Sequence, residues 1–338
     1  SFGVDGNEDR NLFVESIELN GAVTDASEGT LTHDTAEFLG YQTGSANFTP
    51  DNIKVEANTP GGEGPTCGNV YSGSVFFAAL PAAVLLGESD NDRLFGGDGA
   101  DTMYGEQGDD FLHGGDGGDL LFGGEGADTV CGFGGEDTVF GGNGDDLVEG
   151  NVEKDIAFGG NGADTVNGGG GADSLFGGDG ADSVNGGDGN DTVLGDDGDD
   201  TLSGGGDEDL LFGGAGNDNV DGDDGDDLLI YDAVLNAGSH DVYDGGDGFD
   251  TLRLVLSPAQ AADPAILAEI EAFQAHLASG GNGKGKGKGK DTFNFHELGL
   301  TARDIEALEI EITGGQPNAA PTAVDDDFTV DGHREGAA

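Results

Sequence analysis

Several residue types are scarce in this chain of 338 residues. Trp is absent, there are 2 Cys and 1 Met, and only 11 Lys or Arg oppose 69 Asp or Glu, which gives a formal net charge of −58. The shortage of cations excludes nucleic-acid binding, which needs basic surface to neutralise phosphates. Two Cys cannot make a disulfide scaffold. The longest apolar run, residues 75–86, contains Pro81 and is shorter than the roughly 20 residues of a transmembrane helix, so no such helix is expected.

Glycine is the abundant residue, with 69 copies. Collagen is excluded because Gly does not recur at every third position. A chain this acidic with 35% hydrophobic residues is expected to be disordered unless something neutralises its carboxylates.

The middle of the chain is a repeat of nine residues. From Gly87 to Ile230 the sequence divides into 16 nonapeptides (nonads 1 to 16) without insertion. Position 1 is Gly and position 6 is Asp in all 16, position 4 is Gly in 13, and position 8 is always aliphatic or Met. A disordered linker would not keep this register, so the nonad is a structural unit.

The residue types of one nonad predict its local structure. Positions 1 to 6 are rich in Gly and end in Asp, which favours a turn with open backbone carbonyls. Positions 7 to 9 predict a three-residue strand whose position 8 points inward. Such units coil into a parallel solenoid with two nonads per coil, stabilised by stacking. Ca²⁺ binds six to eight carboxylate and carbonyl oxygens, and the turns offer both.

The pattern resembles GGxGxDxUx of the RTX (repeats-in-toxin) family. The resemblance implies an all-β fold: a right-handed parallel β-roll with flanking β segments and one or two short helices. It also implies up to about 14 Ca²⁺ ions between successive turns. The ligands implied by this correspondence are Asp92, Asp101, Asp110, Asp119, Asp128, Asp137, Asp146, Asp155, Asp164, Asp173, Asp182, Asp191, Asp200, Asp209, Asp218 and Asp227, with Asp250 in one further unit after the array.

Some turns depart from the pattern. Nonad 8 (residues 150–158) has Asn151 and Glu153 in place of both turn glycines, and its Lys154 is an alternative to a metal ion for neutralising the turn. Nonads 1 and 14 have Asp90 and Asp207 at position 4, which makes them weaker candidates for calcium sites.

Position 9 alternates with a period of two nonads, so residues of one kind should stack on one outer sheet about 4.8 Å apart. An apolar surface of this length is expected to be covered by the helix predicted below or by a second copy of the chain. The alternative is that the roll tolerates exposed aromatic residues. This apolar ladder consists of Tyr104, Phe122, Phe140, Phe158, Phe176, Leu194, Phe212 and Ile230.

The array divides the chain into five predicted segments: a partial β-sandwich at 1–66, an apolar cap at 67–86, the roll at 87–230, a capping region at 231–313, and a linker with the start of a further module at 314–338. The capping region contains a predicted helix at 264–279, with Ile266, Ile270, Phe273 and Leu277 on one face, and a flexible Gly/Lys loop at 281–290.

Weaker resemblances mark the two ends. GNEDRNLFVESIELNG (residues 6–21) is similar to the late strands of calcium-dependent xylan-binding carbohydrate modules, which implies glycan binding by the N-terminal piece. NAAPTAVDDDFTVDG (residues 318–332) resembles the opening strand of bacterial cadherin-like modules. Both ends are therefore expected to be cuts from a longer protein.

Catalysis is not expected. The sequence has neither HExxH nor GxSxG, so neither a zinc-protease motif nor a nucleophile elbow is present. Cys67 and Cys131 either form a disulfide or remain free thiols. The predicted function is a calcium-binding structural or adhesive module of a large secreted or cell-surface bacterial protein. The RTX resemblance implies type I secretion and folding on extracellular Ca²⁺. The alternative is the non-catalytic C-terminal portion of a secreted polysaccharide-acting enzyme.

Overall fold

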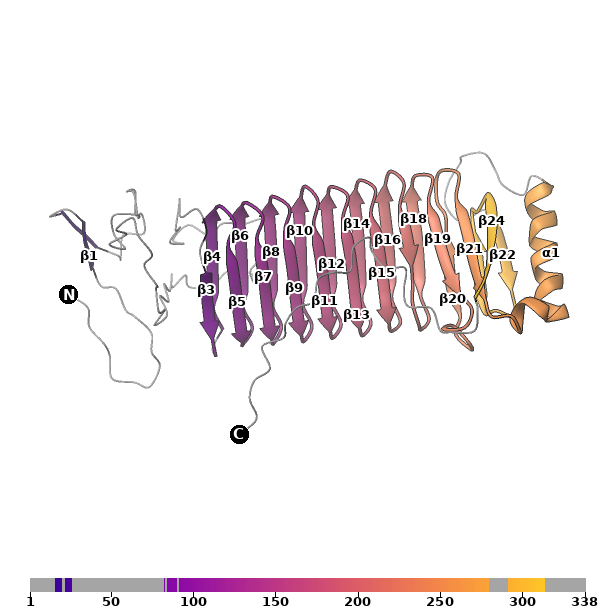
Figure 1. Cartoon of the computed structure of the whole chain (residues 1–338), viewed down its shortest axis with the longest axis horizontal. Coiled ribbons are helices and arrows are strands. Elements are labelled where there is room, and N and C mark those ends of the chain that lie inside the picture. The colour runs from indigo at the N-terminus through magenta and orange to yellow at the C-terminus, as the bar shows by residue number, and fades with distance from the viewer. Residues whose placement is uncertain are drawn as a thin grey trace, which may run out of the picture.

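The nonads coil into a parallel β-solenoid, seen from the side in Figure 1. The structure is a computed structural model that describes residues 16–19, 22–25, 82, 84–89, 91–279 and 291–313. Successive nonads alternate between two facing sheets, so two nonads complete one coil and the 16 nonads make eight coils. The predicted fold class is therefore confirmed.

Each sheet has eleven strands within the described residues. The sheet that takes the odd-numbered nonads (the odd sheet) consists of β4 (Arg93–Asp98), β6 (Phe111–Asp116), β8 (Thr129–Gly134), β10 (Leu147–Val152), β12 (Thr165–Gly170), β14 (Ser183–Asp188), β16 (Thr201–Gly206), β18 (Asn219–Asp224), β20 (Asp241–Asp244), β23 (Leu300–Arg303) and β22 (Thr292–Phe295).

The even-numbered nonads form the other sheet (the even sheet). It consists of β3 (Val84–Glu88), β5 (Thr102–Gln107), β7 (Leu120–Glu125), β9 (Thr138–Asn143), β11 (Ile156–Asn161), β13 (Ser174–Asp179), β15 (Thr192–Asp197), β17 (Leu210–Phe212), β19 (Leu228–Asp232), β21 (Thr251–Leu256) and β24 (Ala307–Ile312).

The strand register is the nonad register. Neighbouring strands in the array pair residues 18 positions apart, as in Val148↔Val166. The prediction of three-residue strands was too short, because most array strands continue through positions 1 to 3 of the next nonad. In nonads 2 to 16, position 2 has a positive φ, which Gly adopts without strain, and most of these nonads have Gly there. Gly160, for example, has φ of 121° and would place a Cβ against the carbonyl oxygen of Gly142.

Position 8 forms the core, as predicted. Its side chains alternate in direction with positions 7 and 9 and fill the space between the two sheets. Fifteen of the sixteen are at most 1% exposed: Met103, Leu112, Leu121, Val130, Val139, Val148, Ala157, Val166, Leu175, Val184, Val193, Leu202, Leu211, Val220 and Leu229. Leu94, in nonad 1, is half-buried and packs against this core. Each contributes one thin layer, so the core exists only through stacking.

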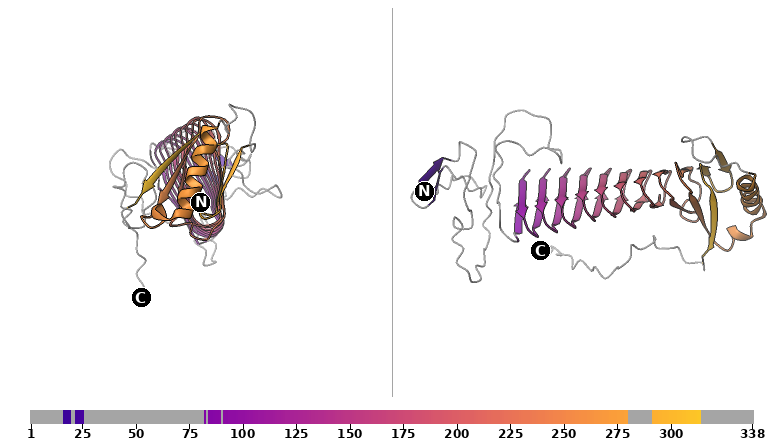
Figure 2. Two further views of the ribbon diagram at one scale, coloured as in Figure 1. Left: turned by 90° about the vertical axis from the view of Figure 1, so that its right-hand side faces the viewer. Right: turned by 90° about the horizontal axis from the view of Figure 1, so that it is seen from above.

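The predicted helix closes one end of the roll. α1 (Pro264–Ala278) follows η3 (Gln260–Ala262) and begins with Asp263, whose carboxylate caps the N–H of Ala265 at 2.8 Å. Figures 1 and 2 show α1 across the C-terminal end of the stack. Its predicted apolar face is confirmed: Ile266, Ile270 and Phe273 are buried in the core.

The expectation that this helix covers the apolar ladder was wrong. The apolar face of α1 packs against the end of the core, where Phe295 and Leu298 are buried with it, instead of along the outer surface of the even sheet. The physical reason is that the last coil would otherwise expose its interior to water. Strands β22, β23 and β24 lie in the remainder of the capping region, at residues 291–313.

The N-terminal side is described only in part. β3 pairs in parallel with β5, so the end of the predicted apolar cap adds one strand to the even sheet, and the rest of the cap lies outside the described residues. β1 (Ser16–Leu19) and β2 (Ala22–Asp25) form an antiparallel pair, and β1 falls in a segment predicted to be a strand. The remainder of segment 1–66, the loop 281–290 and segment 314–338 also lie outside the described residues. Among the described helices, none has the length and apolar character needed to cross a bilayer.

Candidate metal centre

The position-6 aspartates form two columns, one along each edge of the roll. Position 6 ends the turn, and its side chain points to the same side as that of position 8. Its carboxylate therefore lies inside the roll, at the edge where the turns connect the two sheets. All 16 predicted array aspartates and Asp250 are at most 4% exposed. Carboxylates are rarely buried to this extent without a partner. The even-nonad turns hold the column from Asp101 to Asp250, and the odd-nonad turns hold the column that begins at Asp92.

Hydrogen bonds link each column from coil to coil. From Asp110 onward, Oδ1 of each Asp accepts the backbone N–H of the Asp one coil earlier, at 2.7 to 3.1 Å. This bond fixes the carboxylate and aims its second oxygen into the turn. The repeat therefore produces a regular row of oriented carboxylates.

The second oxygen, Oδ2, is buried and finds no hydrogen-bond partner in the described part of the chain. Burying a carboxylate oxygen without a partner destabilises the folded state by roughly several kcal/mol. A row of such oxygens is therefore expected to bind a neutralising partner. The residues with this arrangement are Asp119, Asp128, Asp137, Asp146, Asp155, Asp164, Asp173, Asp182, Asp191, Asp200, Asp209, Asp218, Asp227 and Asp250.

Burial strongly disfavours the charged form of these groups. It raises the pKa of Asp155 to about 8, and neighbouring carboxylates, Asp137 and Asp173 among them, add to the effect. The pKa of Asp200 and of Asp209 is likewise raised to about 8, with burial as the largest cause. Without a cation, many of these carboxylates would hold a proton near neutral pH.

The turns also supply carbonyl oxygens. An ideal Cβ on Gly123, at position 1, would lie 2.5 Å from Oδ2 of Asp128 and 2.5 Å from the carbonyl oxygen of Gly141. Carboxylate and carbonyl thus converge where only a glycine leaves room. No three His, Cys, Asp or Glu side chains meet at one point within the described residues, so the backbone must provide the other ligands. An oxygen-only set of carboxylates and carbonyls suits Ca²⁺.

The structure adds one residue that the sequence analysis missed. Asp241 is 1% exposed and continues the odd-nonad column, because its Oδ1 accepts the N–H of Asp218 at 2.8 Å. It occupies position 6 of NAGSHDVYD (236–244), so the nonad register could have identified it. Its Oδ2, however, accepts a hydrogen bond from Ser239 Oγ at 3.2 Å, unlike the array carboxylates.

The irregular nonad 8 keeps the geometry of its neighbours. Asn151 and Glu153 adopt φ of 84° and 69°, the conformation that glycine has elsewhere, and Asp155 is wholly buried with Oδ1 bonded to the N–H of Asp137. Lys154 is exposed, and its charge lowers the pKa of Asp173, which burial raises overall. In nonad 14, Asp207 similarly takes φ of 77°.

The apolar ladder lies on the outer face of the even sheet, as its period predicts. Rings from Tyr104 to Phe176 stack with centroids 4.6 to 4.9 Å apart. These rings are half-buried, whereas Leu194, Phe212 and Ile230 form a buried cluster with Val255. Arg253 follows Ile230 in register and pairs with Glu309 at 2.7 Å, which ends the apolar row.

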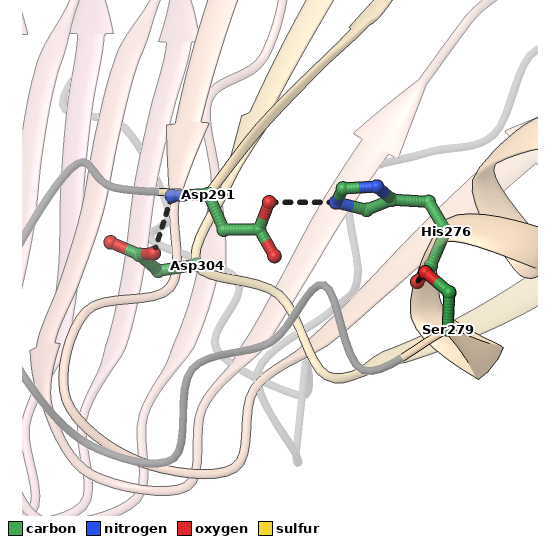
Figure 3. Close-up of polar contacts among 4 residues, drawn as sticks. All are labelled: His276, Ser279, Asp291 and Asp304. Atoms are coloured by element: carbon green, nitrogen blue, oxygen red, sulfur yellow. Dashed lines mark hydrogen bonds and ion pairs between the residues drawn. The ribbon is translucent and has the colours of Figure 1, made fainter.

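The His and Cys side chains of the described residues that are treated next make packing, hydrogen-bond or disulfide contacts. His113 stacks on Phe133 at 3.7 Å between centroids, and burial lowers the pKa of its imidazole. His276 contacts Asp291 at 2.7 Å and holds the end of α1 to the closing segment, where the N–H of Asp291 donates to Asp304 (Figure 3). Cys131 is wholly buried and disulfide-bonded. The disulfide alternative is therefore the one that holds for Cys131, and Cys67 lies outside the described residues.

Comparison with known families finds four copies of the RTX calcium-binding nonapeptide repeat, at residues 84–112, 113–148, 158–193 and 194–229. The chain therefore contains RTX calcium-binding repeats folded as a β-solenoid. The matches leave out most of the irregular nonad 8. They give no support to the xylan-binding resemblance of residues 6–21 or the cadherin-like resemblance of residues 318–332. No curated protein matches the chain.

Proposed function

We propose that this chain is a calcium-folded structural module of a large secreted or cell-surface bacterial protein. The observation that carries the proposal is the row of buried Oδ2 atoms without hydrogen-bond partners, from Asp119 to Asp250, in a fold whose repeats are of the calcium-binding RTX type. The position-6 aspartates and nearby turn carbonyls hold the ions between successive turns. The array accommodates up to about 14 ions, one for each pair of neighbouring turns on the same edge.

Calcium binding supplies the free energy of folding in this proposal. The ligand set does not exist in the unfolded chain, so the free energy of binding becomes free energy of folding. The net charge of −58 keeps the metal-free chain expanded through self-repulsion. Extracellular calcium-binding modules use sites with dissociation constants of about 10⁻⁴ to 10⁻³ M, so the module would be unfolded inside the cell and folded outside it.

The role is architectural and non-catalytic. RTX repeats are typical of secreted bacterial proteins, and type I export of an unfolded chain agrees with folding that waits for external calcium. A stack of eight coils makes a stiff rod that can separate or present neighbouring domains, as an adhesin requires.

Calcium counting and hydrodynamic size test this proposal together. The whole chain, equilibrated with millimolar CaCl₂ and passed through gel filtration, should carry many bound ions and have a small Stokes radius. The same chain in EDTA or in millimolar MgCl₂ should elute as an expanded polymer, because Mg²⁺ demands a smaller octahedral site. The proposal would be contradicted if the Stokes radius were equal in all three buffers. It would also be contradicted if the chain in CaCl₂ carried no more than about one bound ion.

A further inference from the structure

The even-nonad carboxylate column does not stop at its last repeat. Asp227 donates its N–H to Oδ1 of Asp250 at 3.0 Å, which is the bond made throughout the array. Asp250 in turn donates its N–H to Oε2 of Glu306 at 2.8 Å, 56 residues further along the chain. Glu306 therefore occupies the place of the next position-6 Asp.

The segment around Glu306 keeps the repeat register although it lacks the repeat sequence. Ala307 pairs with Thr251, and its N–H donates to the carbonyl of Asp250 at 2.9 Å, as position 7 does in each coil. Gly222 in the array would place a Cβ against Oδ2 of Asp227 and the carbonyl of Gly245. Gly245 meets the corresponding pair: Oδ2 of Asp250, at 2.6 Å, and the carbonyl oxygen of Asp304.

This turn is three residues shorter than a nonad turn. Asp304 supplies the position-1 carbonyl and Glu306 the position-6 carboxylate only two residues later, whereas the repeat separates the two by five. The longer side chain of Glu compensates for the shorter loop. The turn has no glycine, and the family matches end at residue 229, so repeat patterns alone do not reveal it.

The two carboxyl groups have no cationic partner. Asp250 is 0% exposed, and its Oδ2 finds no hydrogen-bond partner among the described residues. Neither Asp250 nor Glu306 pairs with a Lys or Arg in the part of the chain that the structure describes. Burial is the largest cause that raises the pKa of Asp250 to about 8, and the charges of Asp227 and then Glu306 add to it. Two adjacent carboxylates in such surroundings repel each other unless a cation lies between them.

The odd-nonad column ends differently. Asp241 donates its N–H to the carbonyl of Gly299, not to a carboxylate, and its Oδ2 is already bonded to Ser239. Within the described residues, no further carboxylate accepts the N–H of the last Asp on this edge, so the column does not continue beyond Asp241. Of the two columns in the described chain, only the even-nonad column therefore continues into a carboxylate of the closing segment.

We propose that Asp250, Glu306 and the carbonyl oxygen of Asp304 form a divalent-cation site beyond the repeats, which binds Ca²⁺ and fastens the closing segment 300–312 to the roll. This inference rests on the proposed function, because it assumes that the array aspartates bind calcium. It extends that function by making the C-terminal cap itself calcium-dependent.

Glu306→Gln tests the site with little change in shape. The amide oxygen of Gln can still accept the N–H of Asp250, so only the charge is lost. Glu311→Gln is the matched control, since Glu311 lies exposed on β24, the strand that begins directly after Glu306. In millimolar CaCl₂ the whole chain with Glu306→Gln should hold one Ca²⁺ fewer than the wild type and the control. Its residues 300–312 should also exchange amide hydrogens at least tenfold faster.

If no cation binds at this site, the change in hydrogen exchange should have the opposite direction. Without a cation, removing one of two repelling carboxylates leaves the ion count unchanged and slows exchange in the cap. That outcome overturns the inference while the array continues to bind calcium. A wild-type chain that binds no calcium would instead contradict the proposed function. If Glu306→Gln does not fold, anomalous diffraction from wild-type crystals grown with CaCl₂ decides: an ion between Asp250 and Glu306 supports the site, and its absence beside filled array sites refutes it.

Discussion

Oδ1 of Asp173 accepts a hydrogen bond of 2.8 Å from the backbone N–H of Asp155, while Oδ2 of the same buried carboxylate has no hydrogen-bond partner in the described chain. The first contact holds two coils in register and is satisfied without metal. The second oxygen is the part of the side chain that requires a cation. One residue type thus both aligns the coils and provides a calcium ligand.

Asp173→Asn separates these two roles. Its amide oxygen can still accept the N–H of Asp155, but the charge and the acceptor at Oδ2 are lost. We expect the free energy of unfolding in calcium to fall by about 3 kcal/mol, the scale for removing one partner of a buried charge pair. Calcium-dependent urea unfolding measures this change. Asp188→Asn, which removes the same charge from an exposed position 3, should leave the midpoint nearly unchanged. Equal effects of the two substitutions would show that only net charge matters.

Protonation of the buried carboxylates at low pH should partly replace calcium in stabilising the fold. In the metal-free fold, burial raises the pKa of Asp155 from an ordinary value of 3.8 to about 8. A raised pKa means that the folded state binds more protons than the unfolded state. The metal-free fold is therefore most stable below about pH 4 and loses stability as pH rises from 4 to 8. In EDTA, circular dichroism should show more β structure at pH 4.5 than at pH 7.5. A spectrum that gains β structure with rising pH would contradict the assignment.

The thin core has one underfilled layer. Ala157 is wholly buried between Val139 and Leu175 in register, where every other array residue of position 8 is larger. Ala157→Val adds two buried carbon atoms and should stabilise the calcium-loaded roll by about 1–2 kcal/mol. Thermal melting in excess calcium measures the gain, with Ala163→Val at an exposed turn position as the control. A lower melting temperature for Ala157→Val would show that the sheets are already in contact at this layer.

The stacked rings of the even sheet should contribute to stability. Replacing Phe140 and Phe176 by Asp interrupts three stacked pairs, which together are worth about 2–4 kcal/mol. Asn167→Asp with Asn185→Asp introduces the same charges at position 9 of the odd sheet and should have a much smaller effect. Melting and sedimentation measured together separate stacking from self-association. If both double variants behave like the wild type, the ladder has no role in stability or assembly.

Much of this architecture follows from the sequence because a nine-residue period leaves few choices. The invariant Gly and Asp positions predicted the coil, the inward position 8 and the alternating outer faces. The sequence did not predict how α1 packs, because its apolar face matches both the open end and the ladder, and only the exposed interior of the last coil decides between them. Glu306 could not be predicted, because a shortened turn without glycine has no repeat signature. Asp241 could have been predicted, because it occupies position 6 when the nonad register is continued to residues 236–244.

The dependence of the fold on calcium is tested most directly by far-ultraviolet circular dichroism of the whole chain at pH 7.5. In EDTA the spectrum should be that of an unordered polymer, and addition of 5–10 mM CaCl₂, about tenfold above the weak-site range, should convert it cooperatively to a β spectrum. Chelation should reverse the change. A β spectrum that is the same in EDTA and in calcium would contradict the account, because the buried carboxylates would then be accommodated without metal.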